Sequence, residues 1–170
     1  MSASLLLFVW IVPAGVAKVT AGGTLAPKIL DQYILTWRPD DARGFYAALG
    51  ASGRAAYRQY YLRLDFWFPV LTLTLFYMSL FALVFRPGTR WGWLVLTPLA
   101  MYACDAAENL NHFSMAASYP QLSALSLTFG PWFTAGKWVL LMGLPLVAFA
   151  GGVGLFLRRR TSGAGADESA

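Results

Sequence analysis

Residues 91–113 read WGWLVLTPLAMYACDAAENLNHF, and this stretch decides the fold class. Its first half is almost wholly apolar, whereas its second half holds two carboxylates, two amides and the only histidine of the chain. The stretch is long enough to cross the roughly 30 Å hydrocarbon core of a bilayer as a helix. Ionisable groups in hydrocarbon cost several kcal/mol each, so they must turn away from lipid. We therefore predict a membrane helix whose polar face meets other helices or a hydrated pocket.

The distribution of charge predicts further helices of this kind. Charged residues make up 12% of the chain, about half of the roughly 25% that is usual in soluble domains. None occurs between Asp65 and Arg86 or between Lys137 and Arg158. Together with the opening stretch, these gaps predict membrane spans at about 66–85, 91–113 and 138–157.

A fourth candidate span covers residues 4–20, although Pro13 and Gly15 interrupt it. This segment also fits a cleaved signal peptide, but no basic residue precedes its apolar core. With this span included, the sequence predicts an all-α, polytopic membrane protein with four transmembrane helices. Residues 1–160 would form a single integral membrane domain, and residues 161–170 a disordered tail.

The connections between the spans differ in character. The sequence RPGTR at 86–90 predicts a tight turn between antiparallel neighbours. The segment 114–137 predicts an interfacial or re-entrant piece, with breaks at Pro120 and at Gly130–Pro131. Before the second span, Asp40 or Asp41 can cap a short interfacial helix that Gly50 ends. Ser52 can then start a helix that continues into the membrane.

The basic residues bear on orientation and partners. With four spans, Arg86, Arg90 and residues 158–160 share one side, which the positive-inside rule makes cytoplasmic together with both termini. Basic residues in the segment 22–65 argue for the opposite orientation. The net charge of +5 suits anionic lipid surfaces, and the sequence has no nucleic-acid motif. Membrane lipids are the expected partners, and AFAGGVGLFL in the last span permits close packing with a partner helix.

Helical spacing brings the polar residues of the opening stretch together. On a helix, four of them lie within an arc of about 100° and so share one face: Asp105, Glu108, Asn109 and His112. Tyr102 extends this stripe. The turn centred near Gly88 places Asp65 at the depth of His112 on the neighbouring helix, and Lys137 begins the last span on the same side. These residues would line one polar pocket.

Two carboxylates one helical turn apart repel each other when both are ionised. One of them therefore holds a proton, or both meet a cation. Such a pair is suited to general acid–base chemistry, and the apolar surroundings predict a lipid or isoprenoid-like substrate for an isomerase, cyclase or hydrolase. The expected catalytic residues are Asp105, Glu108, Asp65 and His112. The expected substrate-binding residues are Asn109, Tyr102, Arg58, Tyr61 and Lys137.

Other interpretations of the same residues remain open. A metal site is disfavoured because Glu108 and His112 are four residues apart, unlike the Glu-x-x-His of di-iron bundles, and no cofactor is expected. The protein could instead be a proton-linked carrier of small solutes or a non-enzymatic membrane subunit. In that case Lys137 would reach the headgroups, Asp65 would pair with a nearby arginine, and Asn109 would join helices.

The chain also resembles a loose pattern of small four-helix membrane proteins without an assigned activity. The pattern consists of LGxxGRxxY, DxxFP and, in the next span, DxxEN. The matching residues are Leu49, Gly50, Gly53, Arg54, Tyr57, Asp65, Phe68, Pro69, Asp105, Glu108 and Asn109. The resemblance covers roughly residues 31–140. It implies that Asp65 belongs with the polar face of the following span, and it assigns no catalytic role.

Overall fold

The computed structural model of this chain describes residues 30, 33, 36–61, 69–86 and 88–167. Every regular element in these ranges is helical, which confirms the predicted all-α class. In chain order the elements are α2 (Pro39–Ala56), the π-helix η2 (Tyr57–Tyr61), α4 (Pro69–Val84), the 3-10 helix η3 (Gly92–Leu96), α5 (Thr97–Ser118) and α6 (Ala124–Asp167).

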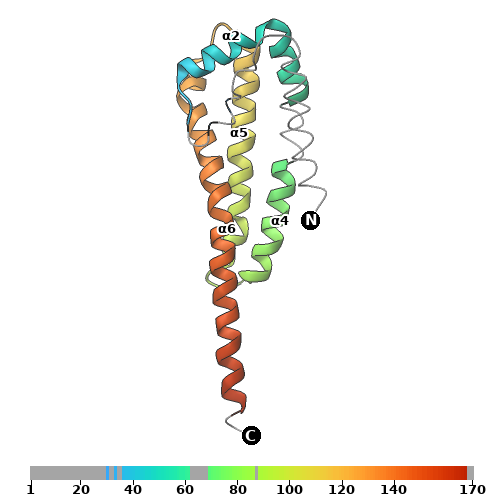
Figure 1. The fold of residues 1–170 in the computed structure, drawn as a ribbon, viewed down its shortest axis with the longest axis vertical. Coiled ribbons are helices and arrows are strands. Elements are labelled where there is room, and N and C mark those ends of the chain that lie inside the picture. Colours follow the sequence, from blue (N-terminus) through green and yellow to red (C-terminus); the bar gives the residue numbers. More distant parts are fainter. Residues whose placement is uncertain (1–29, 31–32, 34–35, 62–68, 87, 168–170) are drawn as a thin grey trace.

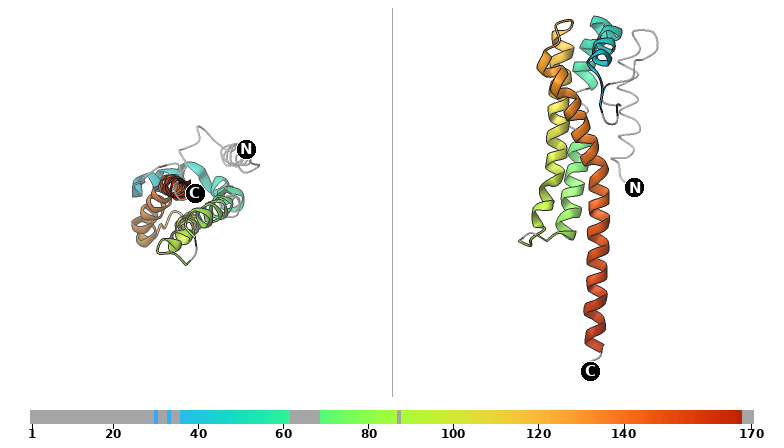
Figure 2. Two further views of the ribbon diagram at one scale, coloured as in Figure 1. Left: turned by 90° about the horizontal axis from the view of Figure 1, so that it is seen from below. Right: turned by 90° about the vertical axis from the view of Figure 1, so that its left-hand side faces the viewer.

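Three long helices form a bundle that one kinked helix covers at an end. α5 packs along α6, and α4 packs against both of them. Figure 1 shows α2 lying across the end of the bundle where α5 and α6 are joined. Figure 2 shows that α6 continues well past the turn between α4 and α5. The bundle therefore has an α2 end and a turn end.

The turn between α4 and α5 is as tight as the sequence predicts. Gly88 has a φ of 84°, a left-handed conformation that glycine adopts without a steric penalty. The side chain of Thr89 donates a hydrogen bond of 2.8 Å to the carbonyl of Arg86. α4 and α5 consequently run antiparallel (Figure 1).

One helix start and one helix end depart modestly from the predicted bounds. α5 begins at Thr97 because Pro98 occupies its first turn, where the missing N–H is not needed. The preceding residues of the predicted span form η3. α2 runs through Gly50 with a kink (φ 62°) rather than ending there. Asp41 accepts a 2.7 Å hydrogen bond from the backbone N–H of Arg38 at the start of α2.

The connection before the last span is only partly as predicted. α5 ends at Ser118 and α6 begins at Ala124, so the expected break at Pro120 is confirmed. The expected break at Gly130–Pro131 is wrong, because α6 passes through it without interruption. Near this proline, Asn111 donates to the carbonyl of Ser126 at 3.2 Å. α6 also continues to Asp167, into the segment 161–170 predicted as a disordered tail.

Among the described helices, one stretch is long and apolar enough to cross a membrane by length and composition. It is Ala124–Leu157 of α6, with 34 residues, and an 18-residue window within it has a mean hydropathy of 2.2. Leu71–Val84 of α4 is apolar but shorter, and α5 carries the polar face. The predicted first span, residues 4–20, lies outside the described residues.

The buried interior consists of a polar layer between two apolar clusters. The cluster at the α2 end contains Leu30, Trp37, Ala42, Phe45, Tyr46, Tyr57, Met115 and Ala116. The second cluster, nearer the turn end, contains Phe81, Met101, Leu144 and Ala148. Along α5, the buried side chains between Met101 and Met115 are Asp105, Glu108, Asn109 and His112. This order fixes the depth of the candidate site within the bundle.

Candidate functional site

The centre of the polar layer is an ion-paired group of three side chains. Nζ of Lys137 on α6 is paired with Oε2 of Glu108 and lies 3.5 Å from Oδ1 of Asp105. Both carboxylates are on α5, and their side chains are at most 1% exposed. The helical spacing predicts this convergence, and the structure confirms it for these three residues. We call them the lysine–carboxylate cluster.

Glycines on α6 allow the two helices to approach closely enough for these contacts. A Cβ atom at Gly136 would lie 3.0 Å from Sγ of Cys104. At Gly130, a Cβ would lie 2.3 Å from Nδ2 of Asn111 and 2.6 Å from Cζ2 of Trp37. A larger residue at Gly130 would therefore have to displace the side chains of Asn111 and Trp37. No pattern in the sequence predicted this role of the glycines.

Thr134 and Trp37 complete the surroundings of Glu108, and neither was predicted. The hydroxyl of Thr134 donates to Oε1 of Glu108, and Nε1 of Trp37 donates to Oγ1 of Thr134 at 3.0 Å. Both side chains are buried. Thr134 precedes Lys137 by one helical turn, so the spacing rule applied to α5 could have found it on α6. Trp37 lies outside any helix and has no comparable local signal.

His112 connects the lysine–carboxylate cluster to α2. Its Nε2 lies 3.7 Å from Oε1 of Glu108, and its Nδ1 lies 3.0 Å from the hydroxyl of Tyr46. The same hydroxyl is 3.3 Å from the carbonyl of His112, to which it can also donate. Burial, and then the charge of Glu108, raise the pKa of Tyr46 well above its usual value. Tyr46 therefore keeps its proton. It was not among the predicted site residues.

The two asparagines of α5 have different tasks. Asn109 is buried and donates from Nδ2 to Oδ2 of Asp105 at 3.2 Å, one turn away on the same helix. It orients that carboxylate. Asn111 instead bonds to the backbone of α6, which is the helix-joining role that the sequence also allowed. Asn109 thus belongs to the site, and Asn111 to the joint between helices.

The remaining predicted site residues lie at the edge of the layer or beyond the described ranges. Arg58 is half-buried, and its guanidinium carbon lies 5.7 Å from the centre of the Phe113 ring. Tyr102 is half-buried on α5, one turn before Asp105. Asp65 and the side chain of Tyr61 lie outside the described residues. The predicted match in depth between Asp65 and His112 stays a prediction.

The amino group of Lys137 lies between the two carboxylates, at the position where they would hold a metal ion. Within the described ranges, no group of three or more His, Cys, Asp and Glu side chains is arranged to hold a metal ion. The lysine–carboxylate cluster contains two acids and one base. With all three groups ionised it would carry one net negative charge, so it has the capacity to bind a proton.

Three titratable side chains form a short row across the site. Glu108, His112 and Tyr46 follow one another at 3.7 Å and 3.0 Å, and the two ring nitrogens of His112 face opposite neighbours. Imidazole can accept a proton on one nitrogen and release one from the other. The row runs from the contact of α5 with α6 to α2, which covers the end of the bundle (Figure 1).

Comparison with protein-family models, curated protein sequences and solved structures finds no match to this chain. The resemblance to small four-helix membrane proteins therefore stays a prediction. The function has to be argued from the site and its surroundings.

Proposed function

We propose that this protein is a four-span integral membrane protein that performs acid–base chemistry on a lipid or isoprenoid-like substrate. In this proposal Glu108 and Asp105 exchange protons with the substrate, and His112, held in place by the hydroxyl of Tyr46, exchanges a proton with Glu108. Lys137 and Thr134 fix the position of Glu108. The proposal has two parts, membrane insertion and proton transfer, which rest on different observations.

Membrane insertion is supported by the inverted distribution of side chains. A layer of charged and polar groups lies in the interior, whereas many large apolar side chains are exposed on the outer faces of the helices. On α6 these include Leu125, Phe129, Trp132, Val139, Met142, Leu146, Phe149, Val153, Phe156 and Leu157. A soluble monomer rarely leaves so much contiguous apolar surface exposed. In a bilayer this surface would contact lipid tails.

Proton transfer is supported above all by one observation: two buried carboxylates share a single lysine. The surroundings of the two carboxylates differ, because Glu108 has Lys137 and Thr134 as partners whereas Asp105 lies farther from the amino group of Lys137. Two carboxylates in different surroundings are the usual arrangement for a paired acid and base. His112 lies within 3.7 Å of Glu108 to receive or return the proton.

A lipid-like substrate is supported by what surrounds the polar layer. Leu110 and Phe113, which neighbour Asn109 and His112 in the chain, are exposed on the outside of α5. Apolar clusters close the layer above and below. A substrate approaching from the bilayer would therefore meet apolar surface first and the carboxylates after it.

A second candidate is a non-enzymatic membrane subunit in which the polar layer only joins helices. The contacts of Glu108 favour this second candidate, because both of its carboxylate oxygens already have partners. One oxygen contacts Lys137 and the other contacts Thr134. Buried polar groups that satisfy one another can fix the packing of helices without any chemistry. The two candidates differ in whether the carboxylates must ionise.

The proposal is tested by exchange of solvent deuterium into lipids. Purified protein in nanodiscs containing lipids extracted from the expression host is incubated in D2O, and the lipids are analysed by mass spectrometry. Wild type should change the mass or structure of one lipid class. Glu108→Gln and Asp105→Asn keep the shape of the side chains but cannot exchange a proton, so each should slow the reaction by about 10²-fold or more.

Asp40→Asn is the matched control, because it makes the same chemical change at an exposed carboxylate paired only with Arg43 among the described groups. It should react as wild type does. Thermal unfolding of each variant in detergent separates lost chemistry from lost folding. If wild type and Glu108→Gln leave the lipids equally unchanged, and the variant is as stable as wild type, the enzyme proposal fails and the helix-joining role stands.

A further inference from the structure

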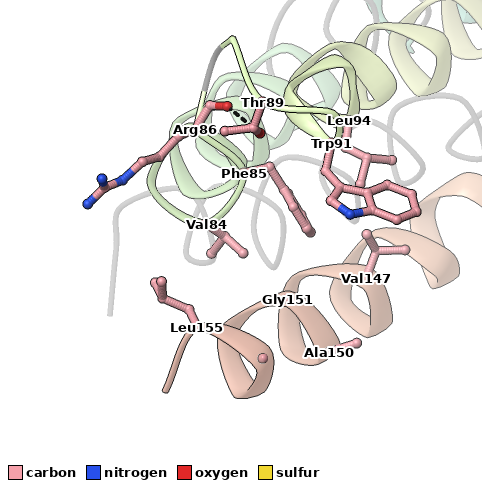
Figure 3. A pocket seen from close by; sticks show the side chains of 11 residues that line it. Val84, Phe85, Arg86, Thr89, Trp91, Leu94, Val147, Ala150, Gly151 and Leu155 are labelled. Atoms are coloured by element: carbon pink, nitrogen blue, oxygen red, sulfur yellow. Dashed lines mark hydrogen bonds between the residues drawn. The ribbon is translucent and has the colours of Figure 1, made fainter. Parts of the chain in front are cut away.

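A groove lies at the turn end of the bundle, between the end of α4, the following turn and α6 (Figure 3). Its volume is about 640 Å³, within the range of about 300–1,000 Å³ that ligand sites usually have. Phe85 and Trp91 face α6 across it, and Val84, Val147 and Leu155 add apolar walls (Figure 3). The groove is thus an apolar slot whose opening lies beside a turn.

Two glycines of α6 shape the groove in different ways. A Cβ atom at Gly151 would lie 2.5 Å from both Cζ of Phe85 and Cγ1 of Val84, so α6 approaches α4 closely there. At Gly154, one turn further on, a Cβ would meet nothing within 4 Å. Close contact at one glycine and open space at the next give the slot a closed side and an open side.

Two arginines lie at the groove or beside one of its lining residues. Arg86 lines it, and Figure 3 shows its guanidinium extending away from the apolar walls. The guanidinium carbon of Arg90 lies 4.6 Å from the centre of the Trp91 ring. Along α6, Arg158–Arg160 follow Leu155 within about one turn. The sequence has no acidic residue between Asp65 and Asp105 or between Glu108 and Asp167, and the residues that line the groove include no carboxylate.

We propose that this groove binds an acyl chain of an anionic phospholipid, with Arg86 and Arg90 holding the phosphate group. The apolar slot would hold the acyl chain of such a lipid, and the arginines beside it would hold its phosphate group. Guanidinium groups bind phosphate through paired hydrogen bonds. Near a membrane surface each basic residue contributes about 1 kcal/mol of attraction to anionic lipid.

The site is separate from the proposed acid–base centre. Gly151 and Lys137 are 14 residues apart on α6, which corresponds to about 21 Å at 1.5 Å per residue. The proposal rests on the membrane-insertion part of the proposed function and not on its acid–base part. Glu108→Gln should therefore bind the lipid as wild type does.

Quenching of tryptophan fluorescence measures this binding directly. The full chain in a non-ionic detergent is titrated with phosphatidylglycerol carrying brominated acyl chains, and in parallel with phosphatidylcholine carrying the same chains. Phosphatidylglycerol should quench saturably and bind at least about fivefold more tightly, since about 1 kcal/mol per arginine corresponds to that factor. Arg86→Gln should weaken its binding about fivefold. Trp91→Phe should reduce the amplitude of quenching, because Trp91 lines the groove.

Gly154→Leu fills the open side of the groove, and Gly152→Leu is its matched control. A Cβ at Gly152 also meets nothing within 4 Å, but this residue does not line the groove. Gly154→Leu should abolish saturable binding, whereas Gly152→Leu should bind as wild type does. Addition of 10-fold more inorganic phosphate than lipid should displace nothing, because phosphate lacks the acyl chain.

Several results would overturn the proposal. They are equal affinity for the two lipids, wild-type binding by Gly154→Leu, equal loss in both glycine variants, or displacement by phosphate alone. If Gly154→Leu changes the oligomeric state in light scattering but not the affinity for lipid, the groove receives a second copy of the chain instead. Extraction of membranes with alkaline carbonate tests insertion separately, so failure of insertion is distinguishable from failure of lipid selectivity.

Discussion

Lys137 is the residue on which the stability of the polar layer depends most. Among the described residues, Lys137 contacts both buried carboxylates, and its side chain is 7% exposed. Removing one partner from a buried ion pair leaves an uncompensated charge, which typically costs about 3–5 kcal/mol. The lysine thus has a structural task whatever the chemistry of the site.

We expect Lys137→Met to lower the free energy of unfolding by about 3 kcal/mol or more, measured by thermal or denaturant unfolding in detergent. Adding Glu108→Gln and Asp105→Asn to this variant should restore much of the loss, because no buried charge then remains unpaired among these three positions. Without such a recovery, the loss would have to come from packing of the lysine stem and not from charge.

Tyr46 gives a pH-dependent prediction at the same scale. Its hydroxyl contacts Nδ1 of His112 at 3.0 Å, so Tyr46→Phe should cost about 1 kcal/mol of stability at neutral pH. The folded-state pKa of Tyr46 is raised, first by burial and then by Glu108. The unfolded chain therefore loses this proton near pH 10 while the folded protein keeps it, and wild-type stability falls as the pH rises above 10.

The stability difference between wild type and Tyr46→Phe should accordingly be constant from pH 7 to 9 and narrow above pH 10. Unfolding curves of both proteins, recorded between pH 7 and pH 11 in the same detergent, provide the measurement. Subtracting the two curves removes the contribution of the other tyrosines. A difference that widens above pH 10 would contradict the raised pKa.

At the scale of elements, the contact between α5 and α6 depends on Gly130. A Cβ atom added at Gly130 would lie 2.3 Å from Nδ2 of Asn111 and 2.6 Å from Cζ2 of Trp37. The Trp37 atom belongs to a rigid ring. Any larger residue must therefore move α6 away from α5 or displace Trp37 from Thr134. Both movements would loosen the surroundings of Glu108.

Gly130→Leu should lower the unfolding free energy by about 1–3 kcal/mol, the usual cost of overpacking. Gly143→Leu, on the same helix, is the control, because a Cβ there meets nothing within 4 Å. It should unfold as wild type does or at slightly higher temperature, since glycine inside a helix is unfavourable. Equal behaviour of the two variants would show that α5 and α6 do not pack as described.

At the scale of the whole molecule, the proposed four spans place the two inter-helix connections on opposite sides of the membrane. Thr89 lies in the turn after α4, and Gln121 lies between α5 and α6; both are exposed. In a Cys104→Ala background, Thr89→Cys should react with an impermeant maleimide only from the cytoplasmic side. Gln121→Cys should react only from the other side.

Reporter tags at the two termini complete this topology test. Four spans with cytoplasmic termini predict that both tags report from the side on which Thr89→Cys is labelled. Labelling of both cysteines from one side would contradict a crossing by α5. Tags on opposite sides would contradict four spans and favour three spans or removal of residues 4–20.

The sequence by itself determined the helical class, the tight turn near Gly88 and the buried face of α5. These features depend on local rules: the length of uncharged stretches, the left-handed preference of glycine and the period of 3.6 residues per turn. Even the partner of Glu108 and Asp105 could be predicted, because Lys137 begins an uncharged stretch at the corresponding depth. Such features require no knowledge of how distant segments pack.

Tertiary structure alone decided which residues surround the buried polar face of α5. Trp37 lies 97 residues from Thr134 in the chain, and Tyr46 lies 66 from His112. Their contacts depend on how α2 lies across the bundle, which no local pattern encodes. The contact of Asn111 on α5 with the Ser126 carbonyl of α6 likewise depends on how the two helices pack. Local periodicity fixes which face of a helix is polar, whereas the closeness of neighbouring backbones decides which groups that face meets.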